Sequence, residues 1–200
     1  MIIPSLLAYD GVMLGDTLSQ LEACGIKRLH IDIMDGHFVP NLSFGPHTVR
    51  ALRKHSSMHL DCHLMVQEPE KWVDIFFQAG ADSVTVHIEV VPKNLIGRPH
   101  LNLAIRPRTP IQSLEPYKNS VSEVLLMSVE PGFGGQAFLP ATSERIMQLH
   151  ALQGSFEIVI DGGMTPATMP LCVGAQHFVV GSALFRAPSL HEGLCAFKRS

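Results

Sequence analysis

The feature that most constrains the fold of this 200-residue chain is a regular alternation of short β-rich runs with helix-like stretches. The eight strand-like runs lie at residues 2–8, 28–35, 59–66, 83–89, 100–107, 123–130, 156–162 and 177–184. The helix-like stretches lie at residues 14–23, 48–55, 69–79, 142–152 and 190–198. Strands that alternate with helices form parallel β-α-β units, and eight such units in this length favour a closed barrel over an open sheet. We therefore predict an α/β protein with the (β/α)8 TIM-barrel fold, in which residues 1–200 form a single domain.

The connection after the fourth strand-like run departs from this pattern. Residues 90–99 contain Pro92, Gly97 and Pro99, which leave little room for a helix, so we expect a shortened fourth β-to-α unit. Such a unit would leave the outward apolar side chains of the fourth and fifth strands without a cover. These side chains are Val84, Val86, Ile88, Leu101, Leu103 and Ile105. Either the neighbouring helices close over these side chains, or another chain does. Because an exposed apolar patch usually marks an interface, we expect a homo-oligomer, or failing that a marginally stable monomer.

Composition and charge exclude several classes of function. Hydrophobic residues make up 46% of the chain and charged residues 16%, which is enough apolar material for a closed core. The net charge of −3 gives no reason to expect binding to nucleic acid or to an anionic membrane. No apolar run approaches the roughly 20 residues that span a bilayer, and the first residues lack the pattern of a secretion signal. The four cysteines form no C-x-x-C pair, so we expect reduced thiols and a cytoplasmic enzyme.

Polar side chains recur on one face of three neighbouring strands. Side chains alternate along a strand, so residues two apart share a face. The shared faces carry His30, Asp32 and Met34, then Asp61, His63 and Met65, then Thr85, His87 and Glu89. The opposite faces are apolar and would pack on the helices, so the polar faces should point into the barrel near the carboxyl ends of the strands, where barrel active sites lie. At the end of the seventh strand, Asp161 would face Asp32 across the mouth.

Two interpretations of this polar cluster stay open at this point. The first is a buried network of histidines and aspartates that satisfy one another's hydrogen bonds. The second is a metal site, because two histidines and two carboxylates suit Zn²⁺, Fe²⁺, Mn²⁺ or Co²⁺. The presence of Asp161 on a distant strand favours the metal site.

Glycine-rich sequences follow the sixth, seventh and eighth strand-like runs. They contain Gly132, Phe133, Gly134 and Gly135 in the first loop, Gly162 and Gly163 in the second, and Gly181 and Ser182 in the third. Glycine allows backbone N–H groups to approach an anion closely, and barrels commonly hold phosphate at the ends of their last strands. We therefore expect a phosphate group to be bound there by the backbone.

At these residues the sequence resembles the ribulose-phosphate 3-epimerase family. The stretches that carry the resemblance are PSLLA at 4–8, HIDIMDGHFVPN at 30–41, FGP at 44–46, DCHLM at 61–65, VHIE at 86–89, MSVEPGFGGQ at 127–136, DGG at 161–163 and GSALF at 181–185. They run from the first strand to the last, and MDGHFVPN and PGFGGQ are highly specific.

The resemblance implies a role for each candidate residue. One divalent metal ion (Zn, Fe, Mn or Co) would be held by His30, Asp32, His63 and Asp161. Asp32 and Asp161 would also be the catalytic acid/base pair. The substrate, a phosphorylated ketose, would contact Ser5, His63, Met34, Met65 and Met127, and its phosphate would be bound by Gly132, Phe133, Gly134, Gly135, Gly162, Gly163, Gly181 and Ser182.

The activity that the resemblance implies is a metal-dependent epimerisation in the pentose phosphate pathway. It would interconvert D-ribulose 5-phosphate and D-xylulose 5-phosphate through an enediolate, with one aspartate removing the C3 proton and the other returning a proton to the opposite face. The alternatives are an allulose-6-phosphate 3-epimerase and a non-catalytic sugar-phosphate-binding barrel. The chain departs from the family pattern at Arg106, where the family usually has asparagine, and in the shorter stretch after Glu89.

Overall fold

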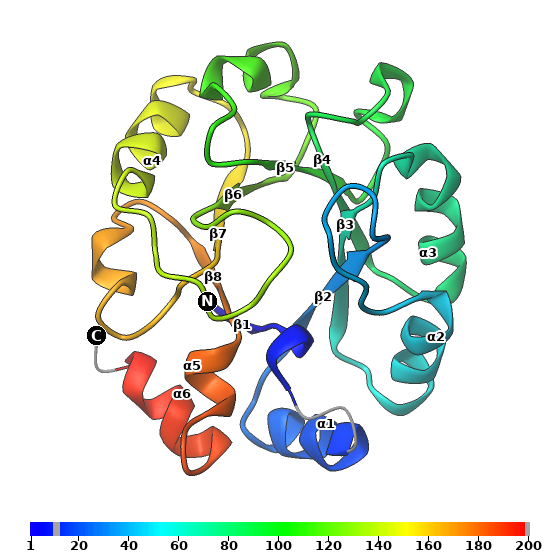
Figure 1. Cartoon of the computed structure of the whole chain (residues 1–200), viewed down its shortest axis with the longest axis vertical. Helices are drawn as coiled ribbons and strands as arrows, with labels where there is room; N and C mark the ends of the chain where they lie inside the picture. The colour runs from blue at the N-terminus through cyan, green and yellow to red at the C-terminus, as the bar shows by residue number, and fades with distance from the viewer. Residues whose placement is uncertain (10–12, 199–200) are drawn as a thin grey trace.

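A computed structural model, which describes residues 1–9 and 13–198, contains a single eight-stranded parallel sheet. The strands are β1 (Ile2–Pro4), β2 (Arg28–Met34), β3 (His59–Met65), β4 (Ser83–His87), β5 (Leu101–Ile105), β6 (Glu123–Met127), β7 (Glu157–Asp161) and β8 (His177–Val180). Their order is β1-β8-β7-β6-β5-β4-β3-β2, and an isolated parallel bridge between Ser5 and His30 joins β1 to β2. The strands form a ring inside a layer of helices (Figure 1), which confirms the predicted (β/α)8 barrel.

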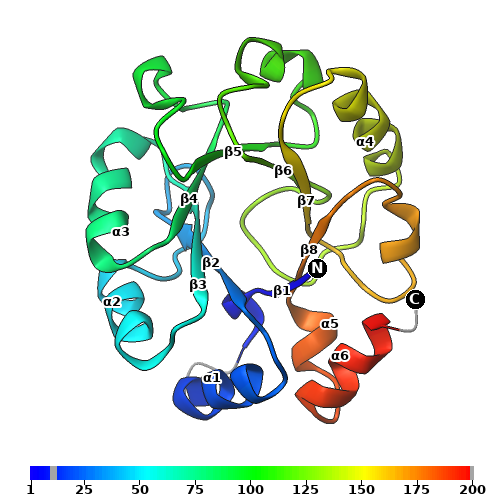
Figure 2. The ribbon, with the colours of Figure 1, turned by 180° about the vertical axis from the view of Figure 1, so that it is seen from behind.

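The helices lie on the outside of the ring in both views (Figures 1 and 2). They are α1 (Leu14–Ala23), α2 (Pro46–His55), α3 (Val73–Ala79), α4 (Thr142–Ala151), α5 (Ser182–Phe185) and α6 (Leu190–Lys198). Shorter 3-10 segments are η1 (Leu6–Ala8), η3 (Pro69–Lys71), η4 (Lys93–Leu95), η5 (Ile111–Tyr117) and η6 (Met169–Leu171). Within the described ranges, no helix is both long enough and apolar enough to cross a membrane.

Most predicted elements are present, with shifted ends. Helices α1 and α6 have the predicted bounds, and the stretch predicted at 69–79 is divided between η3 and α3. The strand predicted at 177–184 is wrong in its second half, because β8 ends at Val180 and α5 begins at Ser182. Gly181 separates them, and its φ of −106° and ψ of −101° cannot continue a strand.

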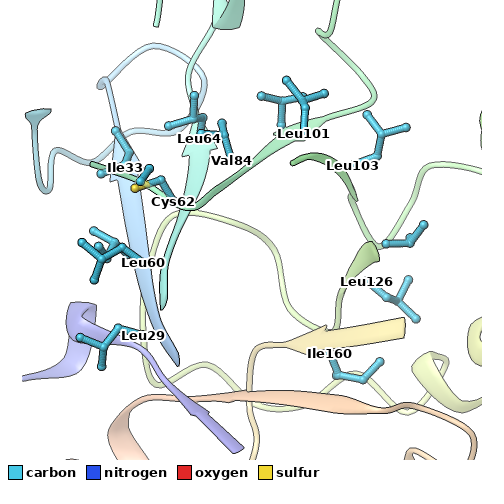
Figure 3. Close-up of a cluster of buried hydrophobic side chains, with 14 of the residues drawn as sticks. Leu29, Ile33, Leu60, Cys62, Leu64, Val84, Leu101, Leu103, Leu126 and Ile160 are labelled. Atoms are coloured by element: carbon cyan, nitrogen blue, oxygen red, sulfur yellow. The ribbon is translucent and has the colours of Figure 1, made fainter. Parts of the chain in front are cut away.

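The core lies between the outer face of the ring and the helices. Outward-facing strand residues such as Leu29, Leu60 and Leu103 point toward this layer (Figure 3) and are fully buried. They belong to one cluster with helix residues that include Phe76 of α3 and Leu149 of α4. Because the apolar side chains face outward, the polar side chains of the same strands face the axis of the barrel.

The outward faces of β4 and β5 are covered within the chain, so another chain is not needed to close over them. The connection after β4 is short, as predicted, and holds only the 3-10 segment η4. Even so, Val86 and Leu103 are 0% exposed within the single chain. They share one buried cluster with Leu95 of η4 and Ile111 of η5, so compact 3-10 segments provide the cover that a full helix provides elsewhere. The homo-oligomer stays a prediction, without this patch as its support.

Candidate active site

A pocket opens at the carboxyl ends of the strands, beneath the loop between β6 and α4 that lies across the ring in Figure 1. Its walls contain the predicted residues Ser5, Asp32, Met34, Met65, Met127, Gly132, Phe133, Gly134, Gly135, Asp161, Gly162, Gly163, Gly181 and Ser182. The structure adds Leu7, Ala8, Val129, Glu130, Pro131, Gln136, Met164 and Val179. None of the described residues that line the pocket is a lysine or an arginine. A bound anion would therefore be held by backbone N–H groups, by any cation in the site, or by Arg186, which lines an adjoining hollow that shares Gly135, Gly163 and Ser182 with the pocket.

His30 and His63 are the two predicted residues that do not line this pocket. Both are 0% exposed and lie behind the carboxylates of Asp32 and Asp161. Nε2 of His30 is 3.3 Å from Oδ1 of Asp32 and 3.8 Å from Oδ2 of Asp161. Nδ1 of His63 is 3.1 Å from Oδ1 of Asp32 and 3.7 Å from Oδ2 of Asp161. Two histidine nitrogens and two carboxylates thus meet at the floor of the pocket, as the alternation along the strands predicts.

A second group of polar residues fixes the orientation of His30. Nδ1 of His30 is 3.0 Å from Oδ2 of Asp61, whose other oxygen accepts a hydrogen bond from Oγ of Ser83. Arg28 lies 3.1 Å from the same aspartate, so Asp61 stays ionised and accepts the Nδ1 proton of His30. Nε2 of His30 is then the ring nitrogen left for the cluster. It points into the cluster and has no hydrogen-bond partner among the described residues.

His63 is held from the opposite side by His87 and Glu89. Nε2 of His63 is 2.9 Å from Nε2 of His87, and Nδ1 of His87 is 3.1 Å from Oε2 of Glu89. Burial lowers the pKa of His87 to about 4. Burial alone would raise the pKa of Glu89, but hydrogen bonds from His87, Thr109 and the backbone outweigh it and lower that pKa to about 2. Glu89 is therefore ionised and His87 neutral near pH 7.

The two carboxylates on the floor of the pocket differ in their affinity for protons. Burial and then the neighbouring Asp32 carboxylate raise the pKa of Asp161 to about 6. Burial opposes ionisation of Asp32 as well, but the positive charge that the neighbouring imidazoles can carry, first that of His30, outweighs it and holds the pKa of Asp32 well below its usual value. Like charges this close resist double ionisation, so one carboxylate is ionised while the other can hold a proton near neutral pH.

The arrangement fits a divalent cation. One ligand atom from each of His30, Asp32, His63 and Asp161 can be chosen so that all four lie within 4.8 Å of one another. The buried Nε2 of His30 has no hydrogen-bond partner in the described part of the chain. A network of histidines and aspartates that only satisfied one another would not leave this atom without a partner. Two imidazole nitrogens and two carboxylate oxygens are a common ligand set for Zn²⁺ and for other divalent first-row metals.

The glycine-rich loops form the other side of the pocket. Gly162 and Gly163 have φ values of 113° and 63°, in the left-handed region that favours glycine. A Cβ atom at Gly162 would lie 2.3 Å from Cγ2 of Val129, and one at Gly163 would lie 2.6 Å from the backbone nitrogen of Phe138. Neither position therefore has room for a side chain. The close packing of these loops brings their backbone to the wall of the pocket.

Two residues that position the site received no role from sequence reasoning. Ser128 is fully buried, and its Oγ donates to the carbonyl oxygens of Asp161 (2.8 Å) and Gly162 (2.6 Å). Asn41 donates from Nδ2 to the carbonyl oxygen of Gly132 at 2.8 Å, which joins the loop after β2 to the loop after β6. Both residues lie within the motifs that carry the resemblance, but the pattern alone does not show which atoms they bind.

Comparisons with known proteins agree with this geometry. The model of the Ribulose-phosphate 3 epimerase family matches residues 1–185. The ribulose-phosphate 3-epimerase cytoplasmic isoform of Oryza sativa subsp. japonica is 41% identical over 100% of this chain and 93% of its own length. The ribulose-phosphate 3-epimerase of Rhodobacter capsulatus is 40% identical over 94% of this chain and 87% of its own length.

Solved structures show the same fold at low sequence identity. The 3-keto-L-gulonate-6-phosphate decarboxylase of Vibrio cholerae is 18% identical and superposes with a TM-score of 0.70 over 100% of this chain and 95% of its own. The orotidine 5'-phosphate decarboxylase of Pyrococcus horikoshii is 19% identical, with a TM-score of 0.70 over 98% of this chain and 97% of its own. With the family model matching residues 1–185 and curated relatives at about 40% identity, the chain belongs to the ribulose-phosphate 3-epimerase family.

Proposed function

We propose that this protein interconverts D-ribulose 5-phosphate and D-xylulose 5-phosphate by inverting the configuration at C3. The observation that carries the proposal is the meeting of Asp32 from β2 and Asp161 from β7 on the floor of one pocket. Inversion needs one group to remove a proton and a second group to return a proton from the other side. The two carboxylates come from strands that β1 and β8 separate in the ring, so they can reach a bound sugar from different sides.

The different pKa values of the two aspartates suit the two roles of proton acceptor and proton donor. Asp32, whose pKa is held low, is ionised and can accept the C3 proton, which the neighbouring C2 carbonyl makes acidic. Asp161, whose pKa is raised to about 6, can hold the proton that is delivered to the opposite face. In the reverse direction the two roles exchange. Oγ of Ser5 donates to Oδ2 of Asp32 at 2.8 Å and fixes the direction of that carboxylate.

One divalent cation (Zn, Fe, Mn or Co) would be held by His30, Asp32, His63 and Asp161. When bound, the cation supplies Lewis-acid stabilisation of the negative charge that develops on the C2 oxygen. The protein contributes the geometry of the site, because Asp61 accepts the Nδ1 proton of His30 and directs Nε2 of that ring toward the cluster.

The remaining residues of the pocket would orient the substrate. Met34, Met65 and Met127 line its wall and are at most 4% exposed, so they exclude water from the reacting carbons. The loops that contain Gly132, Phe133, Gly134, Gly135, Gly162, Gly163, Gly181 and Ser182 would bind the phosphate group. Backbone N–H donors suit this task because the pocket wall carries no side-chain cation among the described residues.

The decisive experiment is a turnover assay with D-ribulose 5-phosphate and with allulose 6-phosphate, each with and without a chelator. We expect turnover of the five-carbon substrate, loss of activity with chelator, and incorporation of solvent deuterium at C3. Preference for the six-carbon substrate would support the sister epimerase instead. Binding of both sugars without deuterium exchange would support a non-catalytic barrel and contradict the proposal.

Two further expectations are open to direct measurement. Light scattering on the purified protein tests the expected homo-oligomer, because it gives the mass in solution relative to the 21.9 kDa chain. The cytoplasmic location stays a prediction that localisation in the source cell would test.

A further inference from the structure

The pair His87 and Glu89 has no part in the proposed reaction, yet it is built against the metal site. His87 is on β4, is 0% exposed and stacks on His63 with 5.0 Å between the ring centroids. The two Nε2 atoms are 2.9 Å apart, so a single proton can lie between them. Which histidine carries that proton decides whether the other nitrogen of His63, Nδ1, is protonated or free.

The hydrogen bonds of Glu89 determine which nitrogen of His87 carries a proton. One carboxylate oxygen, Oε1, accepts from the backbone nitrogen of Arg106 (2.9 Å) and from Oγ1 of Thr109 (2.5 Å). The other oxygen, Oε2, is 3.1 Å from Nδ1 of His87. An ionised carboxylate only accepts hydrogen bonds, so Nδ1 of His87 must be the donor.

The positions of the protons follow from this donor. Because Nδ1 of His87 donates to Glu89, a ring with that single proton accepts a hydrogen bond at Nε2. His63 must then donate from Nε2, which leaves a lone pair on its Nδ1. That Nδ1 atom points at the cluster, 3.1 Å from Asp32 and 3.7 Å from Asp161.

We propose that Glu89 and His87 are positioning residues, which hold His63 in the tautomer that offers Nδ1 to a cation. The inference rests on the proposed metal-dependent function and names the residues that prepare one ligand for it. In the opposite tautomer, Nδ1 of His63 would carry the proton and donate it to Asp32, and a cation would have to displace that proton before binding. Second partners of metal-bound histidines commonly tune affinity in this way.

The surrounding structure packs against His87 and fixes the loop next to Glu89. The ring of Phe38 lies 4.7 Å from the ring of His87, and the guanidinium of Arg106 lies 3.9 Å above Phe38. Arg145 donates from Nη2 to the carbonyl oxygens of Arg106 (3.0 Å) and Thr109 (2.9 Å), which fixes the loop that holds Glu89. A carboxylate held by fixed donors keeps its acceptor oxygen directed at His87.

The test uses Glu89→Gln, which keeps the shape of the side chain and removes its obligatory acceptor character. A second variant, His87→Gln, removes the ring that receives the proton of His63. The matched control is His150→Gln, because His150 lies on the outer helix α4 and its Nε2 bonds to the carbonyl oxygen of Gly174, away from the metal site. Zn²⁺ affinity is measured by competition with a chromophoric chelator, and thermal melts of the metal-free proteins report folding separately.

We expect Glu89→Gln and His87→Gln to bind Zn²⁺ about 10- to 100-fold more weakly than wild type, with the control unchanged. In the Zn²⁺-loaded wild type, nitrogen-15 NMR of the imidazoles should show His63 protonated at Nε2 and His87 protonated at Nδ1. Unchanged affinity in both variants, or a protonated Nδ1 on His63, would overturn the inference while leaving the epimerase proposal intact. A wild-type protein that epimerises without binding any metal would overturn the metal dependence and this inference together.

Discussion

The substitution Gly162→Ala tests how tightly the loop after β7 is built. At φ 113° an L-residue is strained, at a cost of about 1–3 kcal/mol for a residue held in a sparsely populated backbone region. The added Cβ would also lie 2.3 Å from Cγ2 of Val129, far inside van der Waals contact. Val129 is only 6% exposed, so it has little room to move, and overpacking of this kind costs about 1–3 kcal/mol.

The two costs together predict a loss of roughly 2–6 kcal/mol in the free energy of unfolding. The measurement is urea unfolding followed by circular dichroism, with the midpoint and slope compared between variants. The control is Gly134→Ala in the neighbouring loop, where an added Cβ would meet nothing within 4 Å. This control should change stability by less than about 0.5 kcal/mol. A loss below about 1 kcal/mol in Gly162→Ala, or equal losses in both variants, would refute the reasoning.

Three further predictions concern the floor of the pocket and the loop beside it. Asp32→Asn and Asp161→Asn should each lower kcat by at least about 100-fold in a protein that stays folded by circular dichroism; substantial turnover in either variant would exclude a two-carboxylate reaction. Elemental analysis should find about one divalent metal ion per chain, lost in His30→Ala and in His63→Ala; a metal content unchanged by both substitutions would place the ion elsewhere. Hydrogen bonds from backbone N–H groups outweigh burial and lower the pKa of Asp35. Its ionised carboxylate therefore stabilises the fold at pH values above the ordinary pKa, and this stabilisation is lost as the pH falls through the lowered pKa. The stability that wild type holds over Asp35→Asn should therefore shrink between pH 7 and pH 2, and a difference independent of pH would show that ionised Asp35 contributes nothing.

The polar cluster could be predicted from sequence because it depends only on the alternation of side chains along strands. His30 and Asp32 are two residues apart, so a parallel strand places them on one face whatever the loops do. The same rule placed His63 beside them, and the motif after β7 supplied Asp161. The alternation also put His87 and Glu89 on the inner face of the fourth predicted strand, although β4 ends at His87 and Glu89 lies in the turn that follows.

Contacts between loops could not be predicted in the same way. The bond from the backbone nitrogen of Arg106 to Glu89 joins the ends of two strands, and no local pattern encodes its direction. The sequence leaves open what covers the outward faces of β4 and β5 for a similar reason. A short connection was taken to be a poor cover, but the cover depends on how Leu95 and Ile111 pack, which the length of a connection does not reveal. The end of β8 was misplaced because apolar residues continue past Gly181 into α5.

The joint between β1 and β2 gives the barrel an uneven mechanical strength around its circumference. β2 pairs with β3 along seven residues, whereas β1 and β2 share one isolated bridge between Ser5 and His30. Ser5 also donates to Asp32, so the joint with the fewest hydrogen bonds passes beside the reacting carboxylate. The joint between β1 and β2 is therefore the part of the ring with the least backbone pairing to resist opening. Ser5 and Asp32, which line the candidate catalytic pocket, lie at that joint.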